Sequence, residues 1–215
     1  MPSVPSFSNF LSRLDHLVLA VPSLPYGIQT IEEKLGVRAV YGGRHPGLGT
    51  HNALIHLGNK SYLEIIGPDS RQEIAGPLWF GVDKVREPKL VTWAIQESDI
   101  ESNVGELHQI GVYPGPIQDG SRLLSDGTYL TWRYTDPRPL MGEGIVPFFI
   151  DWGTSPHPTD TLEQIIVVQD MKAVHPKPDT IKKMLMALQI EMVVEQGDMP
   201  VLKVLLNTPK GQMWI

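Results

Sequence analysis

Three apolar, strand-prone segments recur along this chain at nearly equal intervals. They read LDHLVLAV from Leu14, LVTWAIQ from Leu90 and LEQIIVVQ from Leu162, and their starts lie 76 and 72 residues apart. Each segment is followed by a stretch with helical periodicity and then by further strand-prone stretches. The pattern predicts three βαβββ units, of which the third is either complete or truncated at its last strand.

Helical periodicity predicts one helix in each unit, at residues 26–35, 100–110 and 178–188. The first two helices end alike, with an apolar residue followed by Gly36-Val37 or by Gly111-Val112. Glycine is the usual residue just past the end of a helix. The remaining predicted strands are residues 37–41, 52–57 and 62–66 in the first unit, 112–113, 129–134 and 146–151 in the second, and 190–194, 201–206 and 212–215 in the third.

A unit of this size with a single helix leaves one face of its sheet uncovered and buries too little surface to be stable alone. The units are therefore expected to pair into an α+β fold, in which mixed sheets curl around a shared cavity. The predicted organisation is a tail at 1–12, paired modules at 13–67 and 89–152 within residues 13–160, and a third module at 161–215. The linker 68–88 carries Trp79 and Phe80, which we expect to pack back onto the body.

The charge balance argues against nucleic acids and anionic membrane surfaces as partners. The chain has 18 Lys and Arg against 24 Asp and Glu, a net charge of −6, and its sequence contains no basic cluster.

The absence of cysteine excludes disulfides, cysteine metal ligands and cysteine nucleophiles. No apolar run approaches the ~20 residues of a membrane span, and residues 1–10 lack the features of a secretory signal. We expect a cytoplasmic protein.

Five motifs follow one another in a characteristic order. They are LDHLVLAV at 14–21, RHPGLGTHN at 44–52, the segment 58–67 with YLE at 62–64, LVTW at 90–93 and PFFIDW at 147–152. In order and spacing they resemble the glyoxalase-like domain family of the vicinal oxygen chelate superfamily. The resemblance extends over residues 13–210 and implies paired βαβββ modules around a small-molecule site.

The resemblance also implies a reaction class. Enzymes of the superfamily hold one divalent metal (Zn, Fe, Mn or Ni here), which binds two neighbouring oxygens of the substrate and acts as a Lewis acid. This implies a metal-dependent lyase, isomerase or dioxygenase. Some members only bind or sequester a small molecule, so a non-catalytic binding protein is the alternative function. Homodimers are common in the superfamily and are expected here.

His16 and Glu64 match the ligands that the family carries on the first and last strands of the first module. Burial of an unpaired carboxylate is costly, so Glu64 within an apolar strand calls for a partner. Alternatively, Glu64 is a candidate catalytic base. In the second module, Thr92 takes the position of His16. Asp151 takes the position of Glu64 in one alignment, and Phe149 takes it in another. A metal site of His16, Glu64 and Asp151 and a pocket without metal both remain open.

The loop at 44–52 is rich in Gly and Pro. Its glycines allow a close approach of the backbone to a ligand. We interpret this loop as a rim of the cavity, with His51 as a candidate acid or base and Asn52 as a substrate contact. The alternative is that His51 and Asn52 cap a tight turn before the strand.

Three residues of the second module are candidate substrate contacts. Trp93 and Phe149 lie on predicted strands and can line an aromatic cavity, with core packing as the alternative. Arg133 can bind a carboxylate or phosphate if its side chain points inward, and it is a surface residue if it points outward. His157 and His175 precede prolines in predicted linkers, and we expect both to be solvated.

Overall fold

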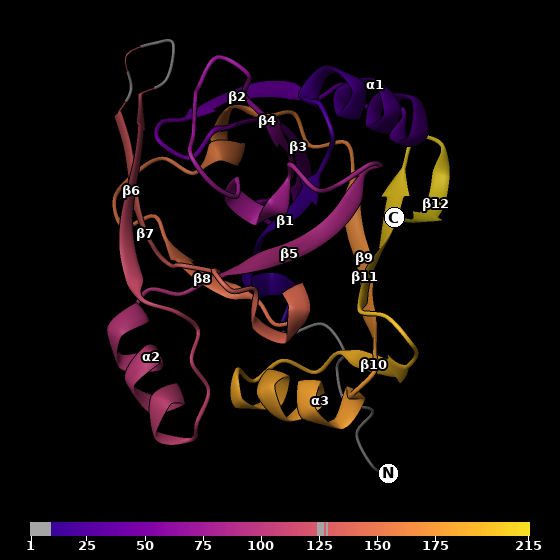
Figure 1. Cartoon of the computed structure of the whole chain (residues 1–215). Helices are drawn as coiled ribbons and strands as arrows, with labels where there is room; N and C mark the ends of the chain where they lie inside the picture. Colours follow the sequence, from indigo (N-terminus) through magenta and orange to yellow (C-terminus); the bar gives the residue numbers. More distant parts are fainter. Residues whose placement is uncertain (1–9, 124–126, 128) are drawn as a thin grey trace.

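The computed structural model describes residues 10–123, 127 and 129–215 of the chain. Residues 1–9 of the predicted tail lie outside this part, whereas Phe10 is buried with its ring 5.9 Å from that of Trp93. The described residues form two sheets and three α-helices (Figure 1), which confirms the predicted α+β class. Short 3₁₀ helices occupy Leu11–Arg13, Trp79–Gly81, Met141–Gly144 and Pro158–Thr161.

The first two units join edge to edge into one eight-stranded sheet. The first contributes β1 (Leu14–Ala20), α1 (Leu24–Leu35), β2 (Val40–His45), β3 (Thr50–Gly58) and β4 (Ser61–Pro68), and the second contributes β5 (Lys89–Gln96), α2 (Ile100–Gln109), β6 (Ile117–Leu123), β7 (Tyr129–Thr135) and β8 (Phe148–Asp151). The strand order is β2-β3-β4-β1-β5-β8-β7-β6. In each unit the first strand runs parallel to the last, and β1 meets β5 antiparallel at the centre. The predicted pairing of modules is thereby confirmed.

Local sequence signals set the limits of the first two helices. α1 ends at Gly36, whose φ of 74° is a left-handed conformation that glycine adopts without strain. α2 begins after Asp99, whose side chain accepts a hydrogen bond from the Ser102 amide. α1 lies close to the sheet because Gly27 has no side chain, and a Cβ there would be 2.5 Å from Val21 Cγ1.

The third unit forms a separate four-stranded sheet. Its elements are β9 (Val167–His175), α3 (Pro178–Ala187), β10 (Val193–Gln196), β11 (Val201–Thr208) and β12 (Gly211–Trp214). Their order along the chain is βαβββ, but the strand order in the sheet is β10-β9-β11-β12. The first strand of this unit therefore pairs with the second and third strands rather than with the last.

Two predicted strands are wrong in position. The strand predicted from Leu162 begins at Val167, and the residues before it form only an isolated bridge between Gln164 and His56. The strand predicted at 112–113 lies at Ile117–Leu123. Pro114 and Pro116 separate the two places, and proline has no backbone N–H to donate to a sheet.

The outer face of the eight-stranded sheet belongs to a core that it shares with the third unit. Leu17, Leu63 and Phe149 of the first sheet pack in one apolar cluster with Met171 and Leu206 of the second. The same cluster takes in buried residues of all three helices. The third unit therefore covers apolar surface that the helices of the first two units leave open.

The inner face carries a smaller apolar cluster. Its members include Val18 and Ala94 at the central strand pair, Phe148 on β8, and Trp79 and Phe80 from the linker 68–88. The linker residues thus pack back onto the sheet as predicted. This face is the one that encloses a pocket.

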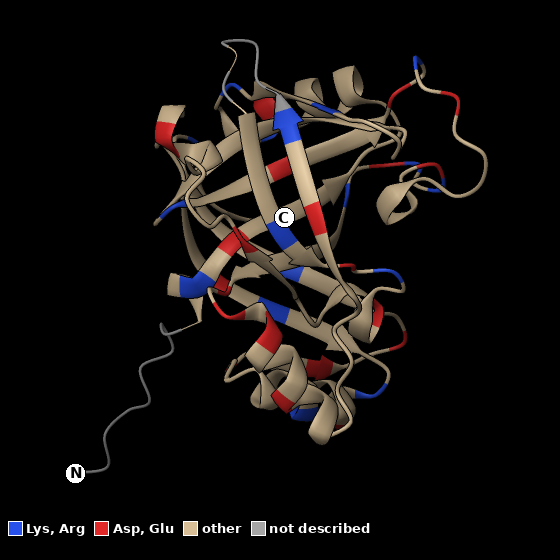
Figure 2. Cartoon of the chain, turned by 90° about the vertical axis from the view of Figure 1, so that its left-hand side faces the viewer, with Lys and Arg blue, Asp and Glu red and all other residues tan. Residues whose placement is uncertain are grey.

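Charged residues of both signs are interspersed along the ribbon in the view of Figure 2. They leave the chain as a whole with a net charge of −6. None of the described helices is both long and apolar enough to cross a membrane.

Candidate active site

The inner face of the eight-stranded sheet encloses a small pocket. Both units contribute to it, with His16, Asn52, Tyr62 and Glu64 from the first and Arg122, Trp132, Tyr134 and Phe148 from the second. Its free volume is about 40 Å³. This space holds a few water molecules or a ligand fragment of a few non-hydrogen atoms.

An irregularity in β1 brings Asp15 and His16 together. Leu14 pairs with Ile95 and His16 pairs with Ala94, so Asp15 is an extra residue inserted opposite β5. Such a bulge breaks the alternation of side chains along a strand. Asp15 Oδ1 consequently lies 2.6 Å from His16 Nδ1, a contact that neighbours on opposite faces of a regular strand do not make.

Asp15 is a fully buried carboxylate with three hydrogen-bonding neighbours. His16 Nδ1 lies 2.6 Å from its Oδ1, and Trp152 Nε1 and His157 Nε2 lie 2.9 and 3.2 Å from its Oδ2. Burial opposes ionisation, but the hydrogen bonds of His157 and His16 outweigh it and lower the pKa of Asp15 from 3.8 to about 2. The ionised carboxylate accepts a hydrogen bond from Nδ1–H of His16 and so leaves Nε2 available for chemistry.

Glu64 faces His16 within the pocket. Its Oε1 accepts a hydrogen bond of 2.6 Å from Asn52 Nδ2, and its Oε2 lies 4.0 Å from His16 Nε2. The second distance is too long for a hydrogen bond, so both atoms can contact one bound substrate. Glu64 is 5% exposed and His16 is 4% exposed, so bulk water is largely excluded from the pair.

His45 lies on the other side of Glu64 and is neutral. Its Nε2 lies 3.6 Å from Glu64 Oε1 and 3.2 Å from Asn52 Nδ2, and its Nδ1 lies 2.8 Å from Thr50 Oγ1. Burial lowers the pKa of His45 to about 4, although the charge of Glu64 acts in the opposite direction. With its proton on Nδ1, His45 donates to Thr50 and accepts from Asn52, which fixes the amide that holds Glu64.

Aromatic rings surround the imidazole of His16. The ring of Tyr62 stacks on it with centroids 4.8 Å apart, and the ring of Phe148 meets it edge-on at 5.4 Å. Burial, together with the charges of Asp15 and Glu64, raises the pKa of Tyr62 well above its ordinary value. The phenol of Tyr62 therefore stays protonated at neutral pH.

Connecting segments complete the walls of the pocket. The linker 68–88 places the ring of Trp79 at 5.5 Å from that of His45 and the ring of Phe80 at 6.2 Å from that of Phe148. The segment that follows β8 contributes Trp152.

The prediction that His157 and His175 are solvated is wrong. Both are buried, because each has a carboxylate partner. His157 Nε2 lies 3.2 Å from Asp15, and His175 Nε2 lies 2.8 Å from Glu143 Oε2. His157 thus belongs to the hydrogen-bonded group around Asp15, and His175 ties the third unit to the second.

Arg122 is the charged one among several pocket residues that the sequence-based candidates did not include; His45 and Tyr62 are two others. It lies on β6, and its aliphatic arm passes over Gly43 of β2, where a Cβ would lie 3.1 Å from Arg122 Cδ. This contact connects the two outermost strands of the eight-stranded sheet. No pattern in the sequence marks Arg122, because the strand that carries it was predicted at 112–113.

Trp93 and Phe149 do not line the pocket. Both are buried in the core on the outer face of the sheet, and Trp93 Nε1 donates a hydrogen bond of 2.8 Å to the Ile145 carbonyl. For these two residues the core-packing alternative holds. Asn52 is therefore the predicted substrate contact that the structure places in the pocket.

Arg133 points away from the pocket. It forms an ion pair with Glu101 on α2, and its Nε lies 3.6 Å from Asp119. Its neighbours Trp132 and Tyr134 are the residues of β7 that line the pocket, as alternation along a strand requires.

His51 also lies outside the pocket. It sits next to Asn52 on β3, and its ring meets that of Tyr41 edge-on at 6.2 Å. Burial lowers the pKa of His51, with the charge of Asp69 acting in the opposite direction. The structure does not bring this candidate acid or base together with Glu64.

The donor set differs from the metal site that the resemblance implies. The strand register places Thr92 of β5 where β1 has His16, and Phe148 of β8 where β4 has Glu64. Asp151 is absent from the residues that line the pocket and lies in a depression of the surface. Within the described part of the chain, no three His, Asp or Glu side chains are arranged to hold a metal ion. The donors present therefore do not fit the implied metal site, since only the first module supplies ligands.

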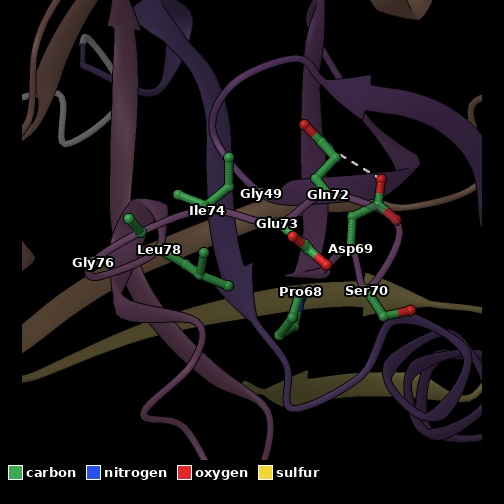
Figure 3. A pocket seen from close by; sticks show the side chains of 10 residues that line it. Gly49, Pro68, Asp69, Ser70, Gln72, Glu73, Ile74, Gly76 and Leu78 are labelled. Carbon is green, nitrogen blue, oxygen red and sulfur yellow. Dashed lines mark hydrogen bonds between the residues drawn. The ribbon is translucent and has the colours of Figure 1, made fainter.

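A larger depression of about 660 Å³ lies at the loop after β4 (Figure 3). Residues 68–78 supply nearly all of its lining, and Asp69 accepts a hydrogen bond from Gln72 Nε2. Its described lining residues include carboxylates but no histidine, lysine or arginine. We place the candidate site in the smaller pocket, because acidic and basic groups converge there.

Comparisons with known proteins agree with this architecture. The model of the glyoxalase-like domain family matches residues 14–189, and no curated protein matches the sequence. The chain is similar to the crystal structure of a hypothetical protein from Staphylococcus aureus, with 15% identity, a TM-score of 0.61 and 87% of each chain covered. This similarity shows a shared fold.

Two methylmalonyl-CoA epimerases are also among the similar structures. The enzyme from Mycobacterium tuberculosis has 18% identity and a TM-score of 0.43, with 65% of this chain and 87% of that chain covered. The enzyme from Streptomyces coelicolor, in complex with 2-nitronate-propionyl-CoA, has 17% identity and a TM-score of 0.45, with 66% and 98% covered.

Proposed function

This chain belongs to the glyoxalase-like domain family, and we propose that it is an enzyme that moves a proton within a small oxygenated molecule. The observation that carries the proposal is the pair formed by Glu64 and His16. A buried carboxylate oxygen and an imidazole nitrogen lie 4.0 Å apart, and a second buried carboxylate orients the imidazole. One substrate atom or two adjacent ones can lie about 3 Å from both groups.

In the proposed step, Glu64 Oε2 takes a proton from a substrate carbon next to a carbonyl group. The electron pair of the broken C–H bond forms a C=C bond, and the π electrons of the carbonyl move to its oxygen. That oxygen takes the Nε2 proton of His16 in its protonated form, which leaves an enol, a neutral His16 and a protonated Glu64. Return of a proton to the opposite face of the same carbon gives an epimer. Where that carbon bears a hydroxyl group, return of a proton to the former carbonyl carbon gives an isomer.

Two further residues position this pair. Asp15 binds Nδ1 of His16 and stabilises the protonated ring. Asn52 holds Oε1 of Glu64 and so directs Oε2 toward the substrate. Because the donor set does not match the implied metal site, we assign no step to a metal.

The test follows the exchange of carbon-bound hydrogen for solvent deuterium by ¹H NMR, with the full chain in D₂O. The panel contains two uncharged ketones, hydroxyacetone and dihydroxyacetone, and two anions, pyruvate and 2-oxobutyrate. We expect enzyme-dependent exchange with at least one compound, and Glu64→Gln should slow it by about 10²–10⁴-fold, the usual size of a general-base effect. Asp151→Asn removes a carboxylate outside the pocket and should leave the rate unchanged.

Two results would contradict the proposal. The first is an exchange rate in Glu64→Gln equal to that of the wild type. The second is binding of a panel compound, seen as a rise in melting temperature, without any exchange, and this result would identify a non-catalytic binding protein.

A further inference from the structure

Unpartnered polar atoms gather at the pocket. Among the described residues, four buried side-chain atoms have no hydrogen-bond partner: Asn52 Oδ1, His56 Nε2, Trp79 Nε1 and Arg122 Nε. Three of these four atoms belong to residues that line the pocket of His16 and Glu64. Buried polar groups in native proteins are nearly always paired, so this clustering indicates that a bound molecule supplies the missing partners.

Two of the three atoms are hydrogen-bond donors. Trp79 Nε1 and Arg122 Nε each carry a hydrogen, and neither group can accept a hydrogen bond. Their side chains come from different parts of the chain, the linker 68–88 and β6, and meet at the same pocket. The missing partner of both is therefore an acceptor.

The charge of Arg122 narrows the chemistry of that acceptor. Carboxylates of the protein lie within 4 Å of Arg13, Arg44, Arg133 and Arg138. The arginines without a described carboxylate so close are Arg122, which is half-buried, and three exposed residues, Arg38, Arg71 and Arg86. The Nε edge of a guanidinium binds two oxygens of one anionic group in parallel. An oxyanion satisfies both the charge and the unpaired donors.

The position of Arg122 is built into the fold. Its arm crosses Gly43, which has a φ of 142° and lies next to a register shift in β2. A side chain at position 43 would meet Arg122 Cδ at 3.1 Å. The edge of the sheet thus leaves a passage for the guanidinium to reach the pocket.

We propose that Arg122 and Trp79 bind an oxyanion of the substrate, and that this group is a carboxylate two or three bonds from the carbon that reacts. The carboxylate is the smaller of the two common oxyanions, which suits a pocket with a free volume of about 40 Å³. The assignment of the reacting end rests on the proposed function of Glu64 and His16. The oxyanion held by Arg122 and Trp79 and the carbon that reacts at Glu64 together define the substrate class as small oxo- or hydroxycarboxylates.

Isothermal titration of the full chain with pyruvate, with uncharged hydroxyacetone of similar size and with inorganic phosphate tests this proposal. We expect pyruvate to bind at least tenfold more tightly than hydroxyacetone. Arg122→Gln should weaken pyruvate binding at least tenfold and leave hydroxyacetone binding unchanged. Trp79→Phe keeps the ring, removes the donor and should weaken pyruvate binding severalfold.

Arg133→Gln is the matched control, because Arg133 lies on the adjacent strand of the same hairpin and points away from the pocket. It should bind pyruvate as the wild type does, and circular dichroism should show all three variants to be folded. Tighter binding of phosphate than of pyruvate, lost in Arg122→Gln, would support an oxyanion site at Arg122 and overturn its assignment to a carboxylate.

Equal affinities for pyruvate and hydroxyacetone, no binding of either anion, or unchanged pyruvate affinity in Arg122→Gln would overturn the proposal. The binding result is separable from the proton-transfer result. Glu64→Gln should still bind pyruvate if Arg122 holds the anion. Exchange of hydroxyacetone protons without preference for anions would leave the role of Glu64 intact and remove that of Arg122.

Discussion

Two buried residues at the pocket and beside it, His45 and Asp15, have pKa values below their ordinary ones. Asp15 stays ionised although it is fully buried, because His16 and His157 bond to it. His45 stays neutral because burial penalises its charged form. Each state fixes one direction of hydrogen bonding, so Asp15 orients His16 and His45 orients Asn52, which in turn holds Glu64.

These two groups predict an acid sensitivity of folding in two separate pH windows. The unfolded chain binds a proton at His45 between pH 6.5 and about 4 that the folded chain does not, so stability falls as pH falls through this window. Asp15 acts in the same direction between pH 3.8 and about 2. At about 1.4 kcal/mol per pKa unit, the losses are about 3–4 kcal/mol for His45 and about 2–3 kcal/mol for Asp15.

Urea unfolding at a series of pH values, with His45→Gln and Asp15→Asn beside the wild type, measures both windows. The difference in the free energy of unfolding between the wild type and His45→Gln should shrink as pH falls from 6.5 to 4. The difference for Asp15→Asn should shrink only below pH 4. Differences that do not vary with pH would show that these residues do not have the assigned charge states.

The sequence allows prediction of some of these residues and not of others. His16 and Glu64 were candidates because they match ligand positions that the resemblance implies, and Asn52 because it ends the Gly- and Pro-rich loop. The structure brings these three residues together. Asp15 was not a candidate, because alternation places it away from His16 and the bulge that overrides alternation has no sequence mark. Arg122 resembles any surface arginine until the curvature of the sheet brings β6 beside β2.

At the scale of elements, the predicted helices and most strands agree with the structure, because their limits depend on local signals such as Gly36 and Asp99. Errors arise where the position of a strand depends on its pairing with a neighbouring strand. β9 begins five residues later than predicted. In the second unit, Phe148 rather than Phe149 takes the position that Glu64 has in the first unit, a difference of one residue in register. A shift of one residue exchanges the two faces of a strand, so such details exceed what a sequence pattern can define.

Two helical glycines make a matched pair at this scale. A Cβ at Gly27 would lie 2.5 Å from Val21 Cγ1, whereas a Cβ at Gly105 would meet nothing within 4 Å. Gly27→Ala should destabilise the fold by about 1–3 kcal/mol through overpacking. Gly105→Ala, in an exposed position of α2, should stabilise it by about 0.5–1 kcal/mol through helix propensity. Urea unfolding at neutral pH measures both, and shifts of the same sign would refute the packing of α1 described here.

At the scale of the whole molecule, the two faces of the eight-stranded sheet have different roles. The outer face is covered by the three helices and by the third unit, which together form one core. The inner face is left free to enclose the pocket, and linker residues and the segment after β8 complete its walls. The third unit therefore supports the fold, while the first two units and the linker between them supply the described side chains that line the pocket.

The central claim is that side chains of the pocket transfer the proton without a metal ion. The most direct test of this claim is to measure whether proton exchange depends on a metal ion. The full chain, purified without a histidine tag, is treated with EDTA and transferred to metal-free D₂O buffer. Deuterium exchange into the substrate found in the panel is then followed before treatment, after it, and after addition of one equivalent of Zn, Mn, Ni or Fe(II). We predict rates within about twofold of one another in all samples, and the loss in Glu64→Gln that a general base requires. Exchange that disappears with EDTA and returns with one of these metals would contradict this mechanism and support the metal-dependent one.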